Sequence, residues 1–98
     1  MDRERVIETL RAHEQELKSA GVLSLRVFGS VARGDAGETS DIDLLADFDK
    51  ERPLSLIGLV RIENRLSDLL GRKVDLVQDG ALKARVRANV EREAVVAF

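Results

Sequence analysis

Residues 22–48 read VLSLRVFGSVARGDAGETSDIDLLADF, and this stretch holds the clearest alternation of strand and turn signals in the chain. Its first part interleaves β-branched and aromatic residues with Ser24 and Arg26, which predicts a strand that ends at Gly29. Small polar residues then interrupt the pattern before it resumes at Asp41. The elements expected here are a strand over residues 22–28, a short helix over residues 30–34, a loop over residues 35–40 and a second strand over residues 41–48.

Helical and strand-like segments flank this stretch on both sides. Apolar residues at spacings of three and four predict a helix over residues 2–19, which Gly21 ends. Pro53 is expected to open the longest helix, which runs to about Leu70 and is closed by Gly71. A third strand is expected over residues 73–78 and a last helix over residues 81–93. The predicted buried side chains of these two helices are Leu56, Leu59, Val60, Leu66, Leu69 and Leu70, then Leu82, Val86 and Val90.

The element order α-β-α-β-α-β-α predicts an α/β (α+β) fold. A chain of 98 residues has room for a small mixed sheet of three to four strands, with helices packed mainly on one face. We expect one domain over residues 1–98.

Composition narrows the classes of function. Sixteen basic against 18 acidic residues give a net charge of −2, and Phe is the only aromatic type, so we expect no direct nucleic-acid binding. With no Cys and a single His, any metal must be a hard ion held by oxygen atoms. His13 falls on the apolar face of the first helix and is expected to be a half-buried packing residue. No stretch is long and apolar enough to span a membrane, and the expected location is the cytoplasm.

The turn at Gly29-Ser30 is suited to a phosphate. Glycine lets the backbone approach a ligand closely, Ser30 can cap the helix or offer its hydroxyl, and a helix N-terminus presents free N–H groups. An ordinary strand-to-helix turn would look the same. The spacing of Gly29 and Gly34 matches a P-loop, but Asp35 follows where that motif requires Lys, so a P-loop is excluded.

Three aspartates are the candidate metal ligands. Asp41 and Asp43 lie two apart on a predicted strand, so both carboxylates project from the same face and repel each other unless a cation lies between them. Asp75 interrupts an apolar strand, where a buried charge would need compensation. Either an Arg forms a salt bridge with Asp75, or Asp75 completes a three-carboxylate cluster around Mg²⁺.

These motifs together resemble the nucleotidyltransferase superfamily related to DNA polymerase β. The runs Gly-Ser-Val-Ala-Arg-Gly-Asp-Ala and Ser-Asp-Ile-Asp-Leu-Leu are similar to its minimal branch, the MNT-domain proteins of HEPN/MNT toxin–antitoxin pairs. The resemblance implies that Gly29 and Ser30 hold a triphosphate and that Asp41 and Asp43 ligate two Mg²⁺ ions. It also implies that Asp75 ligates one ion and helps to deprotonate the attacking hydroxyl. Arg33 either neutralises phosphate charge or is a solvated helix residue.

The expected activity is therefore Mg²⁺-dependent transfer of AMP from ATP to a hydroxyl group. By this resemblance the acceptor belongs to a partner protein, a HEPN-type RNase toxin, and the chain acts as its antitoxin. The alternative is a binding module that neutralises its partner without catalysis. Ile57, Ile62 and the apolar residues 94–98 lie outside the predicted stripes, and they either contact a partner or complete the chain's own core.

Overall fold

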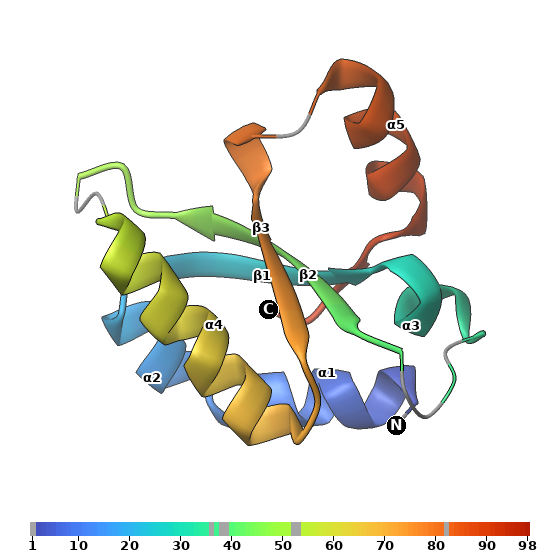
Figure 1. Cartoon of the computed structure of the whole chain (residues 1–98), viewed down its shortest axis with the longest axis horizontal. Helices are drawn as coiled ribbons and strands as arrows, with labels where there is room; N and C mark the ends of the chain where they lie inside the picture. Colours follow the sequence, from blue (N-terminus) through green and yellow to red (C-terminus); the bar gives the residue numbers. More distant parts are fainter. Residues whose placement is uncertain (1, 36, 38–39, 52–53, 82) are drawn as a thin grey trace.

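The computed structural model describes residues 2–35, 37, 40–51, 54–81 and 83–98. Within them the strands form one mixed sheet with the order β3-β2-β1-β4 (Figure 1). β1 (Val22–Phe28) runs antiparallel to both β2 (Ile42–Phe48) and β4 (Val95–Val96), whereas β3 (Val74–Gln78) runs parallel to β2. The predicted fold class and the mixed sheet of three to four strands are confirmed.

The apolar core lies on one face of this sheet. Strand residues such as Leu25, Val27 and Leu44 are fully buried in the same cluster as side chains of α1 (Arg3–Ala12), α2 (Glu14–Ser19) and α4 (Leu56–Leu70). Figure 1 shows these three helices together on one side of the strands, while α5 (Ala84–Glu93) stands on the other. The prediction that helices pack mainly on one face is confirmed, and the opposite face is open at β3, where Asp75 is exposed, although Leu45 of β2 is buried there.

The predicted first helix is in fact two helices. α1 ends and α2 begins at His13, whose φ of −111° and ψ of 17° are not helical. The imidazole Nδ1 lies 2.9 Å from the carbonyl oxygen of Thr9, and the ring is half-buried. The prediction of a single helix over residues 2–19 was therefore wrong, whereas the prediction that His13 is half-buried is confirmed.

The long helix α4 starts later than predicted and presents a different face. Ser55 caps it by accepting a hydrogen bond from the N–H of Gly58 at 3.1 Å, and Pro53 lies outside the described residues. Leu56 is 77% exposed and Val60 is also exposed, contrary to the prediction, because the inward stripe follows the i, i+4, i+8 spacing of one helix face. The side chains that are buried are Ile62, Leu66 and Leu70.

The last helix also departs from the prediction. α5 begins at Ala84, after a short 3₁₀ turn over Asp79–Ala81, rather than at residue 81. Val90 is buried but Val86 is 47% exposed, because α5 packs beside α3 (Gly29–Arg33) instead of lying flat on the sheet. The predicted contact of Leu82 lies outside the described residues.

Residues 94–98 complete the chain's own fold. Val95 and Val96 pair with Val27 and Arg26, the N–H of Leu25 donates to the carbonyl of Phe98 at 3.1 Å, and Ala97 is fully buried. Of the two alternatives left open for this segment, the structure supports the chain's own core. No helix in the part of the chain described here combines the length and apolar character that crossing a bilayer requires.

The outer edge of β3 is covered by polar side chains of α4. Ser67 Oγ accepts the N–H of Val74 at 3.1 Å, and Glu63 Oε2 accepts the N–H of Leu76 at 3.0 Å. These N–H groups face away from β2, so without α4 they would form an unpaired strand edge. The same helix thus connects β2 to β3 and satisfies the edge that the connection creates.

We predict that Ser67→Ala lowers the free energy of unfolding by about 1–2 kcal/mol, because the partly buried N–H of Val74 loses its acceptor. Chemical denaturation monitored by circular dichroism measures the change. Asn64→Ala, at an exposed position of the same helix, is the control and gains similar helix propensity without losing this bond. Equal stability of the two variants would contradict the assigned role of Ser67.

Candidate active site

The parallel register of β2 and β3 brings two of the predicted acidic residues side by side. Asp43 and Asp75 are direct partners in the ladder, and neighbouring strands are about 4.8 Å apart, so both side chains leave the open face of the sheet together. Asp41 lies immediately before β2, which starts at Ile42 rather than at Asp41 as predicted. Two separate stretches of chain therefore deliver three carboxylates to one end of the sheet.

Asp75 is exposed, which corrects the premise that its charge is buried in an apolar strand. Its neighbours Val74 and Leu76 are buried because they point to the core face, and Asp75 alternates away from them. Among the residues that the structure describes, no Arg forms an ion pair with Asp75. The salt bridge that could have explained Asp75 is thus absent there, and its neighbour in the ladder is another carboxylate.

The electrostatics of Asp43 reflect this crowding. Burial raises the pKa of Asp43, the negative charges of Asp75 and then Asp41 raise it further, and the Arg33 guanidinium acts in the opposite direction. Within the described ranges no group of three His, Cys, Asp or Glu side chains lies close enough together to hold a metal ion. The donor set nevertheless fits Mg²⁺, because all three groups are hard oxygen donors and a divalent cation would relieve their repulsion.

Gly29 lies directly against the carboxylate of Asp43. Its φ is +72°, and a Cβ atom added there would lie 2.2 Å from Asp43 Oδ2 and 3.0 Å from its Cγ. Both the backbone conformation and the space therefore require glycine at this position. The sequence suggested a close approach to a ligand; the structure shows that the turn also makes room for a carboxylate.

The short helix α3 begins at Gly29, one residue earlier than predicted. Phe28 is consequently the N-cap and Ser30 lies inside the first turn, so the suggested capping role of Ser30 is wrong. Phe28 provides no side-chain hydrogen bond to the helix terminus. The first-turn N–H groups and the half-buried Ser30 remain suited to an anion, and their phosphate-binding role stays a prediction.

Arg33 lies on the surface, and its role in neutralising phosphate charge stays a prediction. It is exposed and forms ion pairs with Asp35, at 3.4 Å, and with Glu93 of α5, at 3.2 Å. Its charge also reaches the site, since it lowers the pKa of Asp43. Arg33 is therefore a surface residue that remains electrostatically coupled to the carboxylates.

Two basic residues at the start of β3 were not singled out from the sequence. Lys73 Nζ lies 3.9 Å from Asp41 Oδ2, and Arg72 donates hydrogen bonds to the segment that precedes Asp41. Their signal in the sequence is a basic pair at the beginning of a strand that runs parallel to an acid-bearing strand. That signal becomes readable only once the strand order is known.

Comparisons with known proteins bear on the family and the fold of the chain. The family model described as "Nucleotidyltransferase domain" matches residues 10–97. The protein adenylyltransferase MntA of Thermococcus cleftensis is 44% identical over 93 residues, which cover 94% of this chain and 92% of that protein.

Solved structures of other proteins share the fold of this chain. A minimal nucleotidyltransferase superposes with a TM-score of 0.81 at 41% identity, over 97% of this chain and 95% of the other. A toxin–antitoxin structure with AMP-PNP superposes with a TM-score of 0.71 at 20% identity, over 100% of this chain and 73% of the other. At that lower identity the second match establishes a shared fold.

We predict that Gly29→Ala displaces the carboxylate of Asp43, because the added Cβ overlaps Oδ2. The pKa of Asp43, followed by carboxyl-carbon NMR, should change in this variant. Gly34→Ala is the matched control, since Gly34 has a φ of +80° but no atom within 4 Å of an added Cβ. Both variants should lose about 1–2 kcal/mol from the strained backbone. An unchanged Asp43 titration in Gly29→Ala would refute the contact.

A second prediction concerns charge. Asp75→Asn should lower the pKa of Asp43 toward its usual range, because one repelling charge is removed. When folding raises the pKa of a carboxyl group, the free energy of unfolding falls as the pH rises from the pKa of the unfolded state through that of the folded state. This fall should be smaller in Asp75→Asn than in wild type. NMR titration in chelator-treated buffer measures the shift, with the exposed Asp68→Asn as control. A shift of equal size in both variants would show that Asp75 has no special coupling.

Proposed function

The chain belongs to the nucleotidyltransferase domain family, and from that premise we propose that it transfers AMP from ATP to a hydroxyl group of a partner protein. Its membership makes it an enzyme of the nucleotidyltransferase type, as the resemblance in its motifs implied. The observation that carries the proposal is the Asp43–Asp75 pair beside the Gly29 turn. The relative that shares 44% of its residues is a protein adenylyltransferase, which favours AMP and a protein acceptor.

In this proposal Asp41, Asp43 and Asp75 would hold two Mg²⁺ ions. When bound, such ions stabilise negative charge on the attacking oxygen and on the departing pyrophosphate. The N–H groups around Gly29 and Ser30 would bind the triphosphate, and Arg33 would offset part of its charge once released from Glu93. The three acidic side chains and the turn lie at the same end of the open sheet face, so a nucleotide could contact them together.

The reaction itself is a displacement at the α-phosphorus. The acceptor oxygen forms a bond to the α-phosphorus, the bond from that phosphorus to the oxygen bridging to the β-phosphate breaks, and pyrophosphate leaves. In this proposal Asp75 helps to take the proton of the attacking hydroxyl, a role that its exposure to solvent supports. Positioning and charge stabilisation would provide most of the rate enhancement.

We propose that the acceptor is a hydroxyl, typically of Tyr, on a HEPN-type RNase toxin, and that the chain is its antitoxin. The shared fold with a toxin–antitoxin structure containing AMP-PNP supports this proposal and the choice of ATP. The open sheet face also leaves Asp75 accessible to a protein acceptor. We place the reaction in the cytoplasm. A single domain over residues 1–98 remains a prediction.

The second candidate function is neutralisation by binding alone. The exposed apolar side chains of Leu56, Ile57 and Val60 at the start of α4 favour it, because such a surface is typical of protein interfaces. The two functions differ in whether the carboxylates are needed.

We predict that Asp43→Asn reduces transfer of radiolabel from [α-³²P]ATP to a co-expressed toxin partner by at least about 100-fold, because several kcal/mol of charge stabilisation are lost. Asp47→Asn, on the same strand and the same sheet face, is the control and should transfer label normally. Growth of cells that express the toxin provides the second readout. If neither wild type nor Asp43→Asn transfers label and both rescue growth equally, neutralisation by binding is the function.

A further inference from the structure

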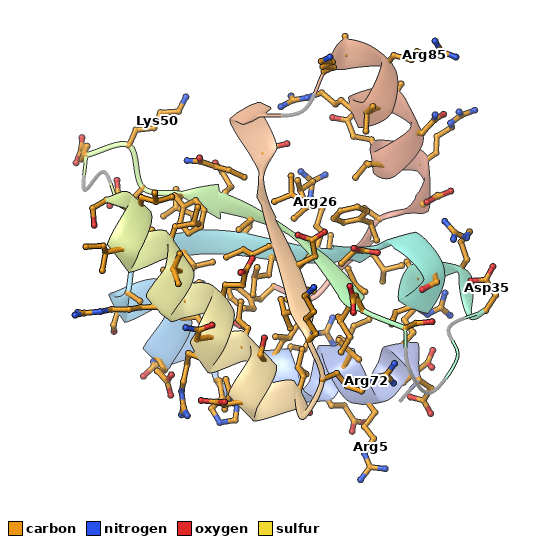
Figure 2. The ribbon with its side chains drawn as sticks, viewed as in Figure 1. Arg5, Arg26, Asp35, Lys50, Arg72 and Arg85 are labelled. Atoms are coloured by element: carbon orange, nitrogen blue, oxygen red, sulfur yellow. The ribbon has the colours of Figure 1, made fainter. Side chains whose placement is uncertain are left out.

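Arg72 lies at the junction of α4 and β3 and contacts the segment that leads into β2. Its Nη2 donates a hydrogen bond to the carbonyl of Gly37 at 2.9 Å and a second one to the carbonyl of Ser40. Gly71, with a φ of +66°, ends α4 and turns the chain just before this residue. Figure 2 shows Arg72 at the beginning of β3, beside that segment.

Gly37 and Ser40, whose carbonyl groups Arg72 contacts, are also hydrogen-bonded to each other. The N–H of Ser40 donates to the carbonyl of Gly37 at 3.2 Å, and the N–H of Gly37 donates to Ser40 Oγ at 3.0 Å. On the other side of Asp41, the N–H of Ile42 donates to the carbonyl of Lys73 at 2.9 Å. The backbone is thus attached to consecutive residues of the β3 entry immediately before and immediately after Asp41.

We propose that Arg72 is a positioning residue that holds Asp41 in place for metal binding. This inference rests on the proposed function, because it takes Asp41 as a ligand of Mg²⁺. The reason is electrostatic: the exposed carboxylate of Asp41 and that of Asp43 repel each other, so Asp41 depends on its backbone, together with the exposed Lys73 Nζ at 3.9 Å, to stay in place. Arg72 fixes that backbone through two neutral carbonyl groups and does not touch the carboxylates.

Substitutions of Arg72 can separate the effect of its hydrogen-bond geometry from the effect of its charge. The guanidinium is planar and rigid, whereas a lysine ammonium carries the same charge on a flexible stem. Arg72→Lys therefore keeps the charge and weakens the fixed pair of hydrogen bonds, and Arg72→Met removes both. Lys73→Met tests charge alone, since Lys73 Nζ lies 3.9 Å from the Asp41 carboxylate.

The experiment measures Mg²⁺ dependence in two ways. In the transfer assay, Arg72→Met should raise the half-saturating Mg²⁺ concentration by about 10-fold or more, in line with residues that orient a metal ligand. Its rate at saturating Mg²⁺ should stay within about threefold of wild type. In Mg²⁺ titrations followed by NMR, the Asp41 amide should require a correspondingly higher concentration. Arg72→Lys should lie between wild type and Arg72→Met in both readouts.

Arg5→Met is the matched control, because Arg5 lies exposed on α1 and projects away from the sheet (Figure 2). It should leave both readouts unchanged. A half-saturating concentration within twofold of wild type in Arg72→Met would overturn the proposal. So would an equal loss of thermal stability, rate and Mg²⁺ affinity in Arg72→Met and Arg72→Lys, which would indicate a structural role only. If wild type itself responds to no Mg²⁺ in either readout, the proposed function fails instead.

Discussion

The parallel pairing of β2 with β3 is the constraint on which the site depends. It places Asp43 directly opposite Asp75, and an antiparallel pair in another register would separate them. A parallel pair needs a crossover, and α4 supplies it on the core face while its Ser67 and Glu63 accept the outer N–H groups of β3. Because the crossover helix occupies one face, the other face of the sheet is free for charged groups.

The repulsion among the carboxylates is opposed by burial on the other side of the same strands. Each acidic residue within β2 and β3 is flanked by core residues: Ile42 and Leu44 around Asp43, Val74 and Leu76 around Asp75. Burying such a side chain contributes about 1.5–3 kcal/mol, which is large beside the repulsion between partly exposed charges. The strands therefore cannot rotate to separate their carboxylates without exposing the core. A bound cation would relieve the repulsion and leave the core buried.

Local signals predicted the strands well because alternation and glycine act at short range. The stop at Gly71 and the strand Val22–Phe28 follow from such signals, whereas the grouping of Asp43 with Asp75 was implied by the family resemblance and depends on the pairing of β2 with β3. Tertiary context decided the rest. The break at His13, the face of α4 that is buried and the pairing of residues 95–96 each depend on which element packs alongside, and no short pattern reports that. The contacts of Arg72 could not be predicted from the sequence for the same reason, since they join residues more than thirty positions apart.

The open face is only lightly covered by α5, and this has consequences for access to the site. Val90 is the buried side chain of α5, and its charged contacts are Arg87 with Asp79 at one end and Arg33 with Glu93 at the other. The Arg33–Glu93 pair is exposed and therefore stabilises little in water, whereas the Arg87–Asp79 pair is partly buried. A nucleotide phosphate that attracted Arg33 would compete directly with Glu93. In the proposed function, phosphate binding at Gly29-Ser30 and the position of α5 would therefore be coupled through the guanidinium of Arg33.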